Sequence, residues 1–203
     1  MSTLDLRPKV MRSGSSATAL GVDPGFANCG FAVITETAEG VIKAIYAETV
    51  LTERCDEDGD VRVTDDDGRR LTEIQRATVR LLHEYNPKLI GIETYVPLAG
   101  KGGNGAFKVA TVYGLIHGLA TSANRPVYGF APTDLRRALL GNSAGSKKDI
   151  YEAVLRICPT AKRVVEAKPK REQEHIVDAM AHAIVALDHT RTTRRLLTQR
   201  RTR

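Results

Sequence analysis

The chain has 203 residues and an ordinary globular composition, with 42% hydrophobic and 27% charged residues. That length suits one sizeable core, and we expect a single domain. No apolar run approaches the roughly 20 residues of a membrane-spanning helix, and the N-terminus lacks a secretory apolar segment, so we expect a cytoplasmic protein without a membrane partner. Three scattered cysteines, Cys29, Cys55 and Cys158, form no CxxC pair, which argues against zinc and disulfides.

The net charge of +6 is unevenly distributed along the chain. Residues 191–203 carry six arginines and no acid, and residues 101–171 carry thirteen basic against four acidic residues. Residues 55–68, in contrast, carry seven acids and one arginine. A local basic excess of this size is typical of a surface that binds nucleic-acid phosphates, although solvated helix faces would give the same count.

The first third of the chain predicts a run of strands. Residues 1–17 are expected to form a disordered tail. The apolar stretches 20–22 and 30–34 and the alternating stretch 41–50 are punctuated by glycines, which predicts three strands joined by tight turns in an antiparallel meander. The acidic residues 55–68 then predict a loop or a small exposed hairpin.

Helices and two further strands are predicted beyond residue 70. Helical spacing of apolar residues runs from Arg70 until Asn86-Pro87 ends it, and again from Phe107 to Leu119 after a glycine-rich linker. The stretches KLIGIE and PVYGFAP predict strands. Thr133 and Ser146 are expected to cap two helices, and a basic connector is expected before the last helix. These elements predict an α/β domain at 18–190, with the last helix at 174–190 and a basic tail at 191–203.

Three acids interrupt apolar stretches and are therefore candidates for a shared site. Asp23 follows the first strand, Glu93 ends KLIGIE, and Asp178 lies in the otherwise apolar last helix. A buried acid is costly unless it is paired or binds a metal, and three converging carboxylates would raise one another's pKa values. Divalent cations would relieve that repulsion, and hard oxygen ligands favour Mg²⁺ or Mn²⁺.

His175 precedes Asp178 by three residues, which places both on one face of a helix. The imidazole could bind a metal or carry a proton, although a histidine near a helix start is often only solvated. His182 continues the same stripe, but we interpret it as an exposed polar position outside the site.

The stretches LGVDPGFANCGFAVI, LIGIETY and HIVDAMAHAIVAL together resemble the RuvC-like Holliday junction resolvases of the ribonuclease H-like superfamily. The resemblance implies a ribonuclease H-like fold with a mixed five-stranded sheet, whose first three strands are antiparallel, flanked by helices. It also implies that Asp23, Glu93, His175 and Asp178 are the catalytic metal ligands. Two Mg²⁺ ions per site are expected, with Mn²⁺ able to substitute.

The resemblance extends to the basic part of the chain. PTDLRRALLGNSAGSKKDIYEAV looks like the segment that carries the family's basic residues near the scissile phosphate, and the helix after the glycine-rich linker would form the two-fold interface of a homodimer. One difference is that the family's aromatic wedge, three residues after the second acid, is replaced by Val96, with Tyr95 one position earlier. The residues expected to contact DNA are Tyr95, Lys101, Lys108, Arg136, Lys147 and Lys148.

These expectations predict a magnesium-dependent endodeoxyribonuclease that nicks two opposed strands of a four-way junction as a dimer. A ribonuclease of the same superfamily, such as a YqgF-type or ribonuclease H-like enzyme acting on RNA or RNA–DNA hybrid, remains an alternative, as does a broader branched-DNA or flap nuclease. An actin-like or sugar-kinase domain shares the Asp-Gly turn but needs a second phosphate loop. A noncatalytic junction-binding protein would not need the four ligands. A helicase partner cannot be named from the sequence.

Overall fold

The computed structural model describes residues 17–55, 62–94 and 103–201, with side chains described up to residue 190. The expected tail at 1–17 thus lies outside the described residues except for Ala17, which begins the first strand. The five strands are β1 (Ala17–Pro24), β2 (Asn28–Glu36), β3 (Ile42–Leu51), β4 (Leu89–Glu93) and β5 (Val127–Phe130).

The strands form one mixed sheet in the order β3-β2-β1-β4-β5. β1, β2 and β3 are antiparallel neighbours, whereas β4 is parallel to β1 and β5 is parallel to β4. The predicted meander and the mixed five-stranded sheet are therefore confirmed. The long connections before β4 and β5 are helical, as parallel pairing requires.

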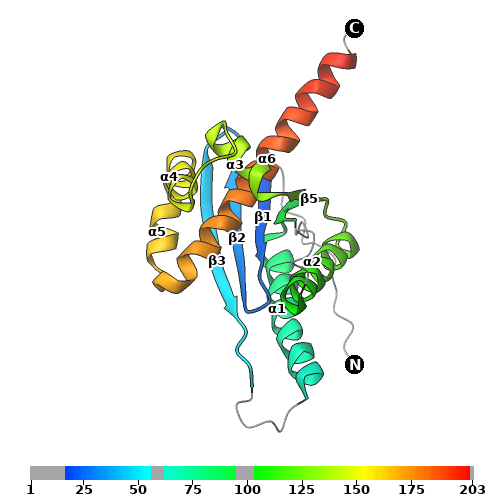
Figure 1. The fold of residues 1–203 in the computed structure, drawn as a ribbon. Helices are drawn as coiled ribbons and strands as arrows, with labels where there is room; N and C mark the ends of the chain where they lie inside the picture. The colour runs from blue at the N-terminus through cyan, green and yellow to red at the C-terminus, as the bar shows by residue number, and fades with distance from the viewer. Residues whose placement is uncertain (1–16, 56–61, 95–102, 202–203) are drawn as a thin grey trace.

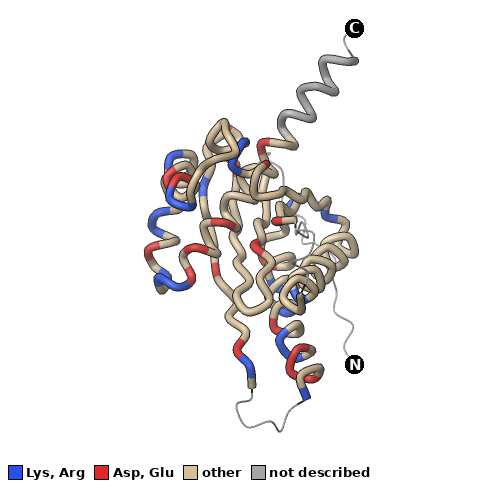
Figure 2. Tube along the Cα trace, in the orientation of Figure 1, with Lys and Arg blue, Asp and Glu red and all other residues tan. Residues whose placement is uncertain are grey.

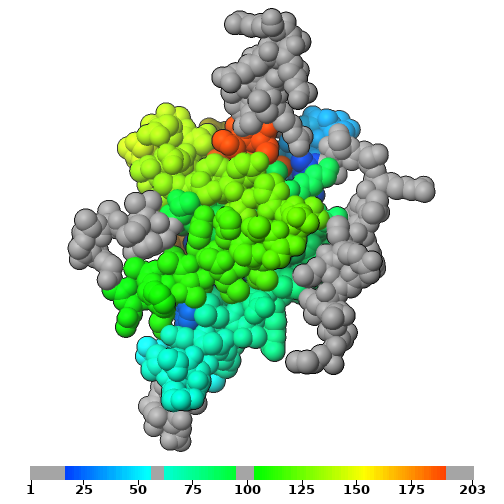
Figure 3. Space-filling model, turned by 90° about the vertical axis from the view of Figure 1, so that its right-hand side faces the viewer, coloured from blue at the N-terminus to red at the C-terminus, as the bar shows by residue number. Residues whose placement is uncertain are grey.

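Six helices cover the sheet in the described part of the chain (Figure 1). On one face lie α1 (Val63–Tyr85) and α2 (Asn104–Ser122), which dominate the side of the molecule seen in Figure 3. On the other lie α3 (Pro132–Leu140), α4 (Lys147–Ile157), α5 (Ala161–Glu166) and the long α6 (Lys170–Arg201). No helix among the described residues is both long and apolar enough to cross a membrane.

Strand periodicity divides the core into two layers. Along β1, Leu20 and Val22 face α1 and α2, whereas Ala19 faces the opposite side, where α6 packs. Since side chains of a strand alternate between faces, Gly21 and Asp23 share the α6 side with Ala19. Both layers exclude water from apolar side chains, which is the main stabilising contribution to such a fold.

Three glycines on neighbouring strands let α6 lie directly on the sheet. A Cβ atom at Gly30 of β2, Gly21 of β1 or Gly91 of β4 would come within less than 3.0 Å of the α6 backbone, at His175, Ala179 and His182 respectively. The three contact points are spaced by four and three residues, which is one face of a helix. The glycines thus form a groove across the sheet, and α6 occupies it.

Several local predictions differ from the structure. The acidic segment ends earlier than expected, because α1 begins at Val63 and already includes Asp65–Gly68. The expected connector contains α5, and Ala131 rather than Thr133 precedes α3, with Pro132 in its first turn. The last helix begins at Lys170 and continues to Arg201, through most of the segment treated as a basic tail. Ser146 does cap α4, in a capping box with Asp149.

The glycine groove gives a stability prediction. Gly21→Ala should destabilise the fold by about 3 kcal/mol or more, because the added methyl group collides with the α6 backbone and neither side can move alone. The matched control is Gly68→Ala in α1, where an added Cβ meets nothing within 4 Å. That control should gain up to about 1 kcal/mol from helix propensity. Urea unfolding measures the stability of both variants. Equal unfolding midpoints for the two would contradict the close packing of α6 in the glycine groove.

Candidate metal and nucleic-acid site

Two of the predicted acids lie side by side at the ends of parallel strands. The β1–β4 register pairs Gly21 with Gly91 and Val22 with Ile92, so the next residues, Asp23 and Glu93, are neighbours across the same pair. Both follow their glycine by two residues and therefore point to the α6 side. The turn after β1 and the acid that ends β4 were separate features of the sequence, and in the structure they lie at the same place on the sheet.

Helix α6 brings the other two predicted residues to the same place. Because its backbone contacts Gly30, and Gly30 pairs with Asp23 across β1 and β2, His175 lies directly over Asp23. The His175 Nδ1 atom is 2.7 Å from Asp23 Oδ2. Since a carboxylate can only accept, Nδ1 donates, and Nε2 remains available for a metal or a proton.

The four residues line one cavity of about 290 Å³. Its wall is completed by an apolar side, by two basic residues and by two residues that were not predicted. Those further lining residues are Pro132, Leu135, Ile150, Arg136, Lys147, Glu174 and His182.

Two carboxyl groups in this cavity have raised pKa values, because they are buried and are repelled by neighbouring carboxylates. Burial, followed by the charges of Asp23 and Asp178, raises the pKa of Glu93 to about 7. Burial and the charge of Asp23 likewise raise the pKa of Asp178 to about 6. The hydrogen bond to Asp23 raises the pKa of His175. Each raised pKa means that the group holds a proton more tightly than usual. A bound cation could supply the same positive charge in place of the proton.

The donor set fits divalent cations. Three carboxylates supply hard oxygen ligands, and an imidazole whose other nitrogen donates to a carboxylate has the orientation usual for metal-binding histidines. Within the described residues no three His, Cys, Asp or Glu side chains are arranged so that they could hold a metal ion as they stand. Asp23, Glu93, His175 and Asp178 would hold the cations.

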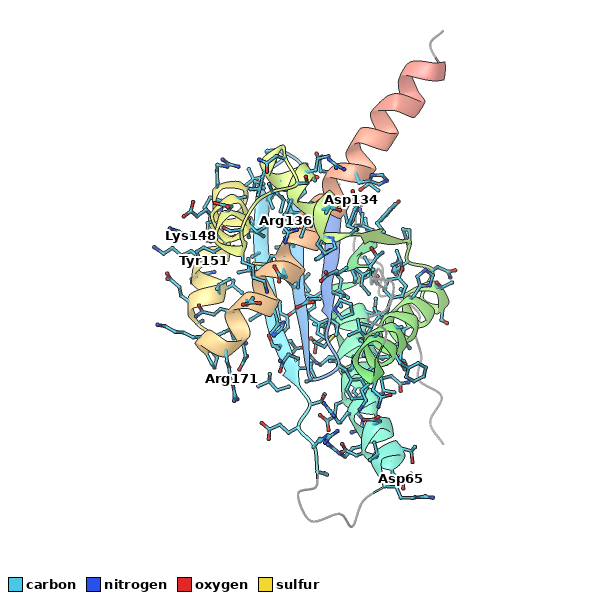
Figure 4. All side chains as sticks on the ribbon, in the orientation of Figure 1. Asp65, Asp134, Arg136, Lys148, Tyr151 and Arg171 are labelled. Atoms are coloured by element: carbon cyan, nitrogen blue, oxygen red, sulfur yellow. The ribbon has the colours of Figure 1, made fainter. Side chains whose placement is uncertain are left out.

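Two predicted DNA-binding residues border the cavity. Arg136 comes from α3 and is half-buried, and Figure 4 shows it between α3 and α6. Lys147 is the first residue of α4, and its ammonium group is paired with the Glu174 carboxylate. Both basic side chains therefore line the same cavity as the acids.

Lys108 and Lys148, which were also predicted to bind DNA, do not line the cavity. The Lys108 ammonium group of α2 forms an ion pair with Asp67 of α1, with 2.7 Å between Nζ and Oδ1, and lies over the Phe26 ring. Lys108 therefore links α2 to α1. Lys148 is 83% exposed and extends away from the body on the outer side of α4 (Figure 4). Their contact with DNA stays a prediction. Tyr95 and Lys101 lie outside the described residues.

Two residues of the cavity were missed by sequence reasoning. Glu174 directly precedes His175, and only the position of α4 brings it to Lys147. His182 was interpreted as an exposed polar position, which is wrong, because it is fully buried between α6 and the sheet. Its Nδ1 atom lies 2.7 Å from the Asp178 carbonyl oxygen, and Nε2 has no hydrogen-bond partner among the described residues. The signal was its spacing, since it follows His175 by seven residues.

A mixed sheet that opens with an antiparallel meander, with acids at the ends of β1 and β4 and the long helix α6 packed across it, is a ribonuclease H-like fold. The sequence profile of the crossover junction endodeoxyribonuclease RuvC matches residues 19–186. The chain therefore belongs to the RuvC family.

Individual relatives agree with this membership. A crossover junction endodeoxyribonuclease RuvC from Thermus thermophilus is 24% identical over 171 residues, covering 83% of this chain and 90% of the relative. The corresponding protein of Syntrophomonas wolfei is 30% identical over 138 residues, covering 68% and 73%. A structure of the T. thermophilus protein in complex with a Holliday junction substrate superposes with a TM-score of 0.67 at 21% identity, covering 86% of this chain and 96% of that one.

The raised pKa values predict how the stability of the metal-free protein depends on pH. Glu93, Asp178 and His175 all bind protons more tightly in the folded than in the unfolded state. For the two carboxyl groups, the contribution to the free energy of unfolding is therefore fully present below their ordinary pKa values of 3.8 and 4.5 and is lost as the pH rises through about 6 for Asp178 and about 7 for Glu93. For His175 it is present below 6.5 and is lost at higher pH. Thermal unfolding in a chelator should show the melting temperature falling over these pH ranges.

Asp23→Asn should flatten that fall, because Asp23 raises all three pKa values. Asp65→Asn removes the same charge from the exposed start of α1 and serves as the control. If Asp23→Asn and Asp65→Asn gave the same pH dependence as the wild type, mutual repulsion in the cavity would be refuted.

Proposed function

We propose that this chain is a Holliday junction resolvase that hydrolyses DNA phosphodiesters with two divalent cations, nicking two opposed strands as a dimer. One observation carries the proposal. Three carboxylates and a histidine from β1, β4 and α6 meet in a cavity that also contains Arg136 and Lys147, in a chain of the RuvC family. Relatives bear the name crossover junction endodeoxyribonuclease, and one related structure contains a Holliday junction.

The residues of the cavity have separate tasks in this mechanism. Asp23, Glu93 and Asp178 would hold the cations through their carboxylates, and the free Nε2 of His175 would act as a ligand or proton carrier. Bound Mg²⁺, or Mn²⁺ in its place, would supply Lewis acidity for the attacking water and the leaving oxygen. Arg136 and Lys147 would hold the phosphate through charge-assisted hydrogen bonds.

Removal of the Asp23 carboxylate should abolish cleavage. Asp23→Asn should lower the rate on a labelled four-way junction in Mg²⁺ by at least about a thousandfold, because the site would lose one of the carboxylates that hold the cations. Asp65→Asn should cleave like the wild type. Equal activity of Asp23→Asn and the wild type would rule out the assigned metal site.

The same assay, extended to flap, duplex and RNA–DNA hybrid substrates, separates this function from its alternatives. If the chain is a resolvase, the junction should be cleaved fastest, with cuts at symmetric positions in two opposed strands. Faster cleavage of the hybrid would move the function to a ribonuclease, and faster cleavage of flaps would move it to a broader branched-DNA nuclease.

The proposed dimer is supported by the exposed side of α2. Lys108 is the only Lys, Arg, Asp or Glu of this helix, and the exposed residues Phe107, Ala110, Gly114 and Gly118 follow one another at helical spacing. Phe107 is 74% exposed. Figure 2 shows the contrast with α4 and α5, where charged positions are frequent. Small residues allow two helices to approach closely, and an uncharged stripe is suited to a second copy of the chain.

Gly114→Glu should turn the dimer into a monomer. The new side chain meets nothing within 4 Å of its Cβ position in the single chain, so the fold should be retained, while a charge would block close approach of a second helix. Light scattering at micromolar concentration should give the mass of a dimer for the wild type and for the control Gly68→Glu. A monomeric wild type would contradict the proposed paired incision.

A further inference from the structure

The proposed mechanism assigns Lys147 to the phosphate but gives no task to Glu174, the ion-pair partner of this lysine in the cavity. The pair joins the first residue of α4 to α6, one residue before His175. Both side chains line the cavity together with the predicted ligands. The cavity thus contains a fourth carboxylate, and this one is paired with a basic side chain.

The two basic residues of the cavity differ in their partners. Within the described residues no acidic group lies within ion-pair distance of Arg136, whereas Lys147 is held by Glu174. The pair is also open to solvent, since the Lys147 side chain is 66% exposed and that of Glu174 is 54% exposed. An ion pair so exposed contributes little to folding and is easily exchanged for another anion.

From this geometry we infer that Glu174 occupies, in the free protein, the place of a nucleic-acid phosphate on Lys147. A backbone phosphate that enters the cavity displaces the Glu174 carboxylate and takes over the ammonium group. The exchange lets the lysine keep a negative partner in both states. It also means that Glu174 weakens binding, both by competing for Lys147 and by repelling the phosphate.

The inference rests on the proposed function, and it concerns substrate affinity rather than the chemical step. Glu174 is in this sense a residue that tunes affinity through Lys147. Neutralising it should strengthen nucleic-acid binding only when the lysine is present. A purely structural ion pair would behave differently, because its loss would lower stability and would not strengthen binding.

A double-mutant cycle tests this inference. Binding of a four-way junction is measured in a chelator, without cleavage, for the wild type, Glu174→Gln, Lys147→Gln and the double variant. Glu174→Gln should bind about two- to fivefold more tightly than the wild type, the range expected for release of an exposed ion pair. In the Lys147→Gln background the same substitution should change affinity by less than half of that factor.

A matched control removes the same charge elsewhere on α4. Glu152→Gln breaks the exposed pair with Lys148 and does not line the cavity, so it measures the effect of net charge alone. The inference is overturned if Glu174→Gln binds no more tightly than Glu152→Gln, or if its gain persists without Lys147. It is also overturned if Glu174→Gln raises the Mg²⁺ concentration needed for half-maximal cleavage in both Lys147 backgrounds, because Glu174 would then be a metal ligand.

Failure of the proposed function would be visible separately. If the wild type bound an RNA–DNA hybrid and not the junction, the resolvase proposal would fall, and the cycle would be measured on the hybrid. The phosphates are chemically the same in both, so the predicted dependence on Lys147 applies to either substrate.

Discussion

The close contact between α6 and the sheet is the constraint on which the rest of this structure depends. It exists because Gly30, Gly21 and Gly91 carry no Cβ on the face where α6 crosses β2, β1 and β4. The same strands place Asp23 and Glu93 on that face, two residues beyond Gly21 and Gly91. Packing and chemistry are thus fixed by one register, and a shift of the helix would separate His175 and Asp178 from the strand acids.

The electrostatics of the cavity follow from this packing. A helix that lies directly on the sheet buries Glu93 and Asp178 near Asp23, and burial together with repulsion raises the pKa values of both. In the metal-free protein the hydrogen bond from His175 to Asp23 partly offsets the repulsion between the carboxylates. At the mouth of the cavity the Lys147–Glu174 pair keeps a cation beside the acids. The acids of the site therefore need compensating positive charge, which bound protons, metal cations or basic side chains can supply.

Local patterns predicted most of the fold because they reflect local physics. Alternation and glycine turns identified the first three strands, the stretches KLIGIE and PVYGFAP identified β4 and β5, and Ser146 marked the start of α4, where capping chemistry requires it. The errors fell where local signals are weak. Polar residues at the start of α1 concealed a helix whose acidic first turn is favourable for its dipole, and α5 has only six residues.

The three candidate acids were recognised from the sequence because each one breaks an apolar pattern, and His175 because it precedes Asp178 by three residues. The family's motifs place all four in order along the chain. The remaining cavity residues required the tertiary structure. The spacing of His182 was visible, but its burial depends on the contact between α6 and Gly91 of β4. Glu174 and Lys147 are 27 residues apart, and nothing local to either predicts the other.

The sequence by itself therefore determined the kinds of groups in the site and the elements that carry them, since alternation, helical spacing and charge are properties of short segments. Only the tertiary structure decided which groups meet. The meeting depends on the β1–β4 register and on the depth at which α6 lies in its glycine groove, and both are set by contacts between residues far apart in the chain.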